Sequence, residues 1–312
     1  MWNDFTQQFW SSTIDGLTNG SIYALIALGY TLVYGVLRLI NFAHSEIFMI
    51  GTFAALGALN LFGIASPQSG LALVGVLLLM LVVAMAVSGA SAVLLERVAY
   101  RPLRKRGASR LAALISAIGA SFFLQELFAI WRGRDQVSIP RVMDKDVWFN
   151  IGSGQVRNDK VLVVVAAIVM MIILERFVNT SRLGRGIRAT AQDADTAVLM
   201  GVNIDRVVMV TFLLGGILAG AAAALYGVFF EITQYNVGFL LGIKAFTAAV
   251  LGGIGNIRGA LIGGLVLGLI ENYGASIFGT QWLDVVAFSV LVLVLMFRPT
   301  GILGEQLQRA RA

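Results

Sequence analysis

The stretch Leu73-Val74-Gly75-Val76-Leu77-Leu78-Leu79-Met80-Leu81-Val82-Val83-Ala84-Met85-Ala86-Val87 contains no polar side chain. It lies inside Ile47–Leu95, a run without Asp, Glu, Lys or Arg that is long enough for two membrane-spanning helices of about 20 residues each. Transmembrane strands would show alternating polarity over about ten residues, and this run does not alternate. The sequence therefore predicts an all-α, polytopic transmembrane helical bundle.

The composition of the whole chain supports a membrane protein. Of 312 residues, 58% are hydrophobic and 13% are charged, with a mean hydropathy of +0.84, whereas soluble domains carry about 25% charged residues. This excludes a soluble enzyme, a disordered regulator and a fibrous repeat protein. The chain has no cysteine, which excludes disulfides and thiolate metal sites. We interpret the net charge of +6 as basic cytoplasmic loops, and we expect no nucleic-acid partner.

Further apolar windows extend the prediction to about eight spans in a single transmembrane domain over residues 1–312. These windows are Gly16–Leu37, Leu111–Trp131 if Glu126 is accommodated, Val161–Leu174 with its polar flank, and Val207–Phe230. The last third differs, because charges recur there every 13 or 14 residues, at Glu231, Lys244, Arg258, Glu271, Asp284 and Arg298. Helices in that region are either short and broken, or their charges face a polar cavity.

Basic residues predict the orientation in the membrane. Clusters lie within 97–110, within 176–188 and at Arg298, Arg309 and Arg311, and we expect all three in the cytoplasm. Residues 132–160 mix both signs of charge, and we expect them outside, together with the N-terminus. Residues 1–15 precede the first apolar run without Lys or Arg, unlike a cleaved signal peptide. The C-terminus is then cytoplasmic.

The segment Asn41-Phe42-Ala43-His44-Ser45-Glu46 places polar residues between two apolar runs. One interpretation is a break in a helix that lines a pathway near the membrane midplane. The alternative is a short polar cytoplasmic loop. One His and one Glu do not complete a metal-ligand set, so we expect no metal site. No catalytic set is present either, since Ser45 and His44 are adjacent and point in different directions on a helix.

Glycines recur at four-residue spacing in the second half of the chain. Residues 252–259 resemble a nucleotide loop only superficially, and no G-x-x-x-x-G-K-[ST] motif occurs anywhere. Small residues at this spacing allow close helix–helix contact. The predicted packing glycines are Gly216, Gly220, Gly255, Gly259 and Gly263.

The loop before Val207 carries a short helix signal. Asp193 is a candidate N-cap, Ala194–Met200 a two-turn helix, and Gly201 the residue that ends it. Such a short helix is either a solvated surface element or docks on a partner.

These stretches also carry a resemblance to a known family. Residues 16–35, Ile40–Glu46, Glu96–Leu103, 182–206, Lys244–Gly255 and Arg298–Gly304 resemble the permease of the high-affinity branched-chain amino acid ABC transporter. The resemblance covers almost the whole chain. Two positions depart from the family pattern, because Ser45 stands where glycine is usual and Arg258 where proline is common.

The resemblance implies an ABC-importer permease fold in a bacterial inner membrane. It implies a second homologous permease subunit, two ATPase subunits that bind ATP and Mg, and an extracytoplasmic substrate-binding protein, with no cofactor on this chain. Residues 182–206 would form the cytoplasmic coupling loop, with ATPase-coupling candidates Arg188, Ala189, Asp193, Ala194, Ala197, Leu199 and Gly201.

The substrate would be a zwitterion with an aliphatic side chain. Candidates for the substrate pathway are Asn41, His44, Glu46 and Lys244. A permease for urea or short amides shares much of this pattern, and a secondary transporter or channel driven by an ion gradient is an alternative from another class. A membrane-embedded enzyme lacks a catalytic set.

Overall fold

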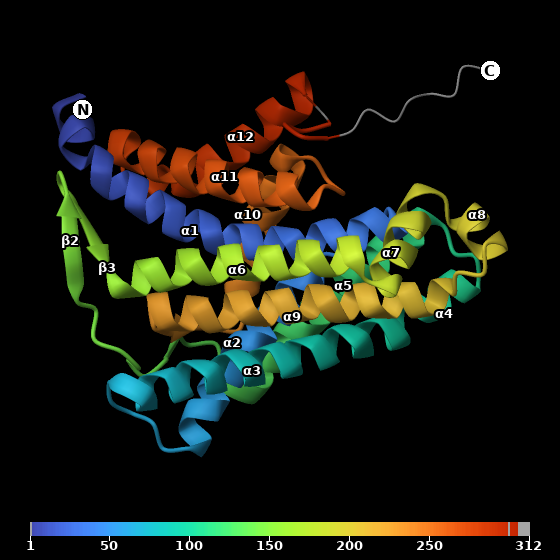
Figure 1. Ribbon diagram of the computed structural model, residues 1–312, viewed down its shortest axis with the longest axis horizontal. Coiled ribbons are helices and arrows are strands. Elements are labelled where there is room, and N and C mark those ends of the chain that lie inside the picture. Colours follow the sequence, from blue (N-terminus) through green and yellow to red (C-terminus); the bar gives the residue numbers. More distant parts are fainter. Residues whose placement is uncertain (1, 299, 305–312) are drawn as a thin grey trace.

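The computed structural model describes residues 2–298 and 300–304, so the basic residues Arg309 and Arg311 lie outside it. The described chain is one bundle of helices that run along a common long axis (Figure 1). In chain order the helices are α1 (Trp2–Leu37), α2 (His44–Leu61), α3 (Gly70–Leu95), a π-helix η1 (Glu96–Tyr100), α4 (Arg101–Lys105), α5 (Arg110–Arg132), α6 (Asn158–Thr180), α7 (Arg182–Gln192), α8 (Ala194–Leu199), α9 (Ile204–Phe230), α10 (Val237–Gly252), α11 (Ile257–Phe278), a 3₁₀ turn η2 (Thr280–Trp282) and α12 (Leu283–Phe297).

Within the described residues, seven helical stretches are long and apolar enough to cross a membrane. They are Gln8–Leu37, Gly70–Lys105, Leu111–Arg132, Asn158–Thr180, Ile204–Phe230, Ile257–Phe278 and Thr280–Phe297. Two shorter apolar helices, α2 and α10, are mostly buried among them. The predicted fold class, an all-α bundle that includes short helices, is confirmed.

The centre of the bundle is formed by α1 and α9. Small residues bring α1 and α11 into antiparallel contact: a Cβ on Gly16 would meet Leu269, and a Cβ on Gly20 would meet Gly264 and Leu265. A Cβ on Gly264 would in turn lie 2.6 Å from the Ala24 Cβ. No larger residue fits this contact without moving one of the two helices.

One end of the bundle carries the N-terminal part of α1 and a hairpin of strands β2 (Val147–Ile151) and β3 (Gly154–Arg157) (Figure 1). Trp10 packs against the hairpin at Gly152 and Gly154, and Lys160 forms an ion pair with Asp15 at 2.5 Å. Strands β1 (Val137–Ser138) and β4 (Ile232–Thr233) form a second small antiparallel pair. The sequence did not predict these strands, because each is too short to show a periodic pattern.

The opposite end carries α4, α7 and α8 (Figure 1). Residues 132–160 and the start of α1 therefore lie at one end, and the first two basic clusters approach the other, as the predicted orientation requires.

Most of the charged residues that recur in the last third of the chain form ion pairs. Glu231 ends α9 with a left-handed backbone (φ 59°) and contacts Lys145 at 2.7 Å. Arg258 pairs with Glu175 of α6 at 2.5 Å. Lys244 pairs with both Glu271 and Asp284. These helices carry charges in mid-sequence because their charges have partners, which reduces the free-energy penalty of placing them in a bilayer.

Candidate functional site

The site is built around a break between α1 and α2. Residues 38–43, here called the connecting segment, are not helical, and α2 begins at His44. The first turn of α2 is enclosed by the bundle, since His44, Ser45 and Glu46 are each at most 4% exposed. This burial differs from that of a solvated polar loop, and the position of the break relative to a membrane stays a prediction.

His44 lies directly against α1. A Cβ on Gly29 would overlap the imidazole ring, and the Tyr30 ring packs edge-on with its centroid 4.8 Å away. The His44 Nε2 atom is buried and accepts or donates no hydrogen bond within the described residues. A buried polar atom without a hydrogen-bond partner is uncommon in folded proteins, which marks His44 as a candidate functional residue.

Glu46 is a fully buried carboxylate in the first turn of α2. Its Oε1 accepts hydrogen bonds from Ser45 (3.1 Å), Ser121 (3.1 Å) and Gln125 (2.9 Å), the last two on α5. Its Oε2 is buried and unpartnered, and no cation pairs with Glu46 among the described residues. The carboxylate is thus oriented by neutral donors, and one of its oxygens is buried without a partner among the described residues.

Asn41 has a different surrounding from the one predicted. Its Oδ1 accepts a hydrogen bond from the buried Tyr100 hydroxyl at 2.7 Å, and Asn41 itself is 2% exposed. Its carbonyl oxygen accepts from the backbone N–H of His44 at 3.0 Å. Asn41 thus holds the start of α2, and its place on the pathway lining stays a prediction.

Lys244 is not part of this group. It lies on α10 and contacts Glu271 of α11 and Asp284 of α12, the latter at 2.7 Å. The Lys244 and Glu271 side chains are nearly buried, and the Asp284 side chain is half exposed. The regular spacing of these charges indicated that they mattered, but it could not show that they meet.

Two glycines that the sequence analysis missed accommodate Ser45. A Cβ on Gly238 or on Gly242 of α10 would overlap the Ser45 backbone or side chain. The single proton of the Ser45 hydroxyl is shared between two acceptors, the Phe42 carbonyl at 2.7 Å and Glu46 Oε1 at 3.1 Å. These two glycines of α10 therefore leave room for serine at position 45, where the family usually has glycine.

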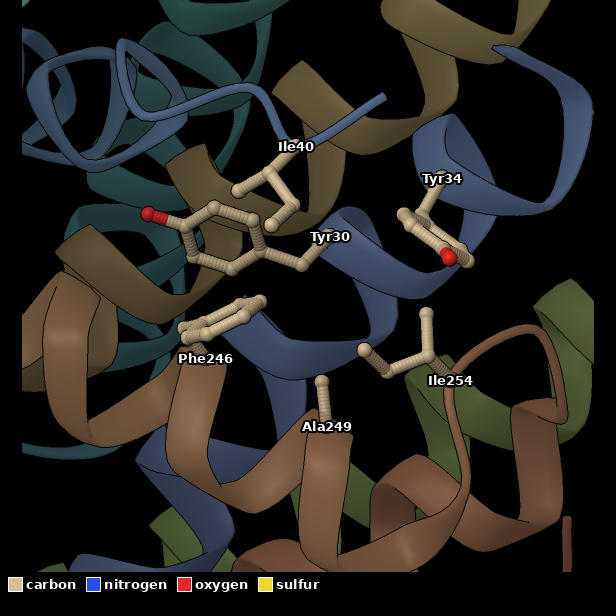
Figure 2. A pocket seen from close by; sticks show the side chains of 6 residues that line it. All are labelled: Tyr30, Tyr34, Ile40, Phe246, Ala249 and Ile254. Carbon is tan, nitrogen blue, oxygen red and sulfur yellow. The ribbon is translucent and has the colours of Figure 1, made fainter. Parts of the chain in front are cut away.

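A small apolar hollow with a volume of about 10 Å³ lies beside the connecting segment. Figure 2 shows its walls facing one another; they are Tyr30 and Tyr34 of α1, Ile40 of the connecting segment, Phe246 and Ala249 of α10, and Ile254. The Tyr30 and Phe246 ring centroids are 6.2 Å apart. The hollow has room for no more than about one water molecule, so it does not hold an amino-acid side chain in this conformation.

Four of the five predicted packing glycines lie in close helix contacts. A Cβ on Gly216 or Gly220 of α9 would meet α3 at Ser88 or Ala84, and one on Gly259 or Gly263 would meet the carbonyl oxygens of Gly252 or Ala248. Gly255 is an error of the prediction. It lies in the turn between α10 and α11 with φ 99° and nothing within 4 Å of its Cβ position, so it serves the turn and not packing.

The predicted short helix is α8, and its caps are confirmed. The Asp193 side chain accepts hydrogen bonds from the backbone N–H groups of Asp195 and Thr196, and Gly201 follows the helix with φ 82°. The Thr196 hydroxyl also donates to Asp193, and these bonds lower the pKa of the carboxyl below its usual value. The preceding helix α7 was not predicted.

The tip of α8 is apolar and exposed. Val198, Leu199 and Met200 are 54%, 86% and 80% exposed, and Ala194 is exposed as well. Two coupling candidates lie elsewhere: Ala197 is only 3% exposed and packs inward, and Arg188 donates to the carbonyl oxygens of Val178 and Asn179 at the end of α6. For these two residues the structure shows internal contacts instead of a free docking face. Ala189 is half-buried on α7.

A multi-pass helical bundle with a buried polar group at a broken helix has the architecture of a membrane permease. The chain belongs to the family described as the permease component of the branched-chain amino acid transport system, which matches residues 12–295. It is similar to the high-affinity branched-chain amino acid transport system permease protein BraD of Pseudomonas aeruginosa, with 46% identity over 298 residues that cover 94% of each chain. It is also similar to the corresponding protein LivH of Escherichia coli, with 42% identity over 305 residues that cover 95% of this chain and 96% of LivH.

Proposed function

We propose that this chain is the membrane-spanning permease subunit of an ATP-driven ABC importer for branched-chain amino acids. Two ATPase subunits bind ATP and Mg, a second homologous permease completes the path, and an extracytoplasmic binding protein delivers the substrate. The subunit lies in a bacterial inner membrane with its C-terminus in the cytoplasm. Family membership and the relatives support the permease role, and the absence of a phosphate-loop motif in the sequence agrees with ATP binding on partners.

The observation that carries this proposal is the apolar tip of α8. Helix α8 lies at the end of the bundle that carries α4 and α7 (Figure 1). Exposed charged residues occur in α7 and α8 themselves, at Arg185 and Asp195. Lipid does not explain exposed apolar side chains in such a polar setting, whereas a groove on a partner does. Residues 182–206 thus act as the coupling loop, with α8 as its docking helix.

Leu199→Glu tests the docking role. Burying a charge in an apolar groove should reduce ATPase co-purification and ATP-driven uptake at least about tenfold, which corresponds to about 1.4 kcal/mol. Leu61→Glu is the matched control, because Leu61 is 82% exposed but lies at the end of α2. Normal co-purification of the ATPase with Leu199→Glu would reject the docking role of α8.

The pathway of the proposal passes the first turn of α2. A zwitterionic substrate needs its ammonium group compensated where water is scarce. Glu46 offers a buried carboxylate with one unpartnered oxygen on the side of α5, and His44 offers an unpartnered nitrogen on the side of α1. Alternating access would expose this turn first to one side and then to the other.

Glu46→Gln tests the pathway. The amide keeps the size of the side chain but removes its charge, so we expect uptake to fall about tenfold while the assembled complex keeps its thermal stability. Glu126→Gln is the control. Glu126 lies on α5, which also carries Ser121 and Gln125, but its side chain is 55% exposed and forms an ion pair with Arg134. Unchanged uptake in both Glu46→Gln and His44→Ala would remove this segment from the pathway.

A reconstitution experiment decides the class and the substrate. The permeases, ATPases and binding protein are placed in liposomes, and uptake of leucine, isoleucine, valine and urea is compared with and without ATP. Aliphatic amino acid uptake that needs ATP and survives a proton uncoupler supports the proposal. Uptake that the uncoupler abolishes while ATP is maintained would favour an ion-gradient transporter, and preference for urea would favour the short-amide permease.

A further inference from the structure

The connecting segment is fastened at two points to the cytoplasmic end of the bundle. One point is Arg38, at its start, and the other is Asn41, next to α2. The two points use different helices, but both lead to the loop that carries α8. This arrangement is not required by helix packing, because each link is a side chain that reaches across to another element.

The first link joins Arg38 to the end of α7. Arg38 ends α1 with a left-handed backbone (φ 52°), and its Nη2 donates to the carbonyl oxygens of Ala191 (3.1 Å) and Gln192 (3.3 Å). Carbonyls at a helix C-terminus have no partner within the helix, and a cation is favoured there. Asp193, the N-cap of α8, comes directly after these residues. A displacement of α8 would therefore pull on Arg38.

The second link joins Asp205 to Asn41 through η1. Asp205, in the first turn of α9, accepts from Arg101 at 3.2 Å and Arg104 at 2.7 Å. Both arginines follow η1, whose last residue, Tyr100, donates to Asn41. A π-helical turn is uncommon and is frequently found at functional positions.

Both links end on the connecting segment, and the second ends next to the polar turn of α2. The Asn41 carbonyl holds the N–H of His44, so the position of Asn41 determines where α2 begins. His44 and Glu46 follow within that first turn. The connecting segment thus lies between the loop that carries α8 and the two polar groups on the pathway.

We infer that Arg38 and Tyr100 are positioning residues that transmit movement of the α8 loop through the connecting segment to the first turn of α2. The inference rests on the proposed function, because it takes α8 as the place where ATP binding acts. A role in stability alone would lower ATP hydrolysis and uptake together. Transmission separates them, because the ATPases still cycle while α2 no longer follows.

The first experiment measures substrate molecules taken up per ATP hydrolysed in the reconstituted complex. Arg38→Ala and Tyr100→Phe should each lower this ratio at least about fivefold, with ATP hydrolysis retained, and Arg38→Lys should recover part of it because lysine can still donate to one carbonyl. The controls are Arg106→Ala, an exposed arginine of the basic cluster within 97–110, and Tyr226→Phe, a buried tyrosine on α9. An unchanged ratio in Arg38→Ala and Tyr100→Phe, or equal losses of hydrolysis and uptake, would overturn the inference.

The second experiment observes the connecting segment itself. Since the chain has no cysteine, Ile40→Cys gives a single labelling site in this subunit on the wall of the apolar hollow. Its reaction rate with a water-soluble maleimide should differ at least about threefold between nucleotide-free and ATP–vanadate-trapped complexes, and the difference should vanish when Arg38→Ala is added. A nucleotide effect that is absent with Arg38 present, or that persists without it, would overturn the inference. Failure of the wild-type complex to import amino acids would instead refute the proposed substrate, and the labelling result would still stand.

Discussion

Gly264→Val is expected to prevent stable folding of the protein. Gly264 faces Ala24 of α1, and its Cβ position lies 2.6 Å from the Ala24 nitrogen and Cβ, so valine forces the two most intimately packed helices apart. Overpacking usually costs about 1–3 kcal/mol of stability. An overlap with the backbone of Ala24, which cannot move without moving α1, should cost at least about 3 kcal/mol. Thermal unfolding of the detergent-solubilised protein, followed by size-exclusion chromatography, measures the effect.

Gly119→Val is the control for this substitution. Gly119 lies within α5, and nothing approaches its Cβ position within 4 Å. Both changes replace a helical glycine by the same β-branched residue, so they share the same intrinsic change in helix propensity. Equal stability of the two variants would show that the α1–α11 contact can relax, contrary to the packing described above.

Lys244→Met is expected to lower the free energy of unfolding by about 3–5 kcal/mol. Methionine has an unbranched side chain of similar length to lysine but carries no charge. Glu271, whose side chain is only 2% exposed, therefore loses its cation. One of the Glu271 oxygens already lacks a hydrogen bond within the described residues, and the neighbouring Tyr23 hydroxyl is a neutral donor that does not replace the charge of the ammonium group. The readout is the thermal stability of the purified subunit or of the assembled complex.

Two comparisons make this prediction specific. Arg258→Met breaks an ion pair in which the Arg258 side chain is 72% exposed, and it should cost no more than about 1 kcal/mol. Adding Glu271→Gln to Lys244→Met should recover part of the lost stability, since the uncompensated charge is removed. Two results would contradict the assignment of a buried charge cluster. One is a loss of stability in Lys244→Met no larger than that in Arg258→Met, and the other is no recovery of stability in the double variant.

The sequence predicted the polar turn of α2 but not how its members are used. Polar residues between apolar runs are visible without a structure, and the break at His44 follows from them. Whether Asn41 lines a pathway or holds a helix depends on Tyr100, which lies 59 positions away. No local pattern links the two residues. The same holds for Gly238 and Gly242, whose importance comes entirely from Ser45 packing against them.

Local patterns in the chain were sufficient for the class of fold and for short elements with their own signals. A charge-free run such as Leu73–Val87 cannot be covered with polar groups, so it must lie in lipid or among other helices, and Asp193 and Gly201 cap α8 through bonds within a few residues. Contacts between residues far apart in the sequence are not determined by local patterns. The pairing of Lys244 with Glu271, the hold of Arg38 on α7 and the fit of Gly264 against Ala24 depend on which helix faces meet, and that is settled by the packing of all the helices together.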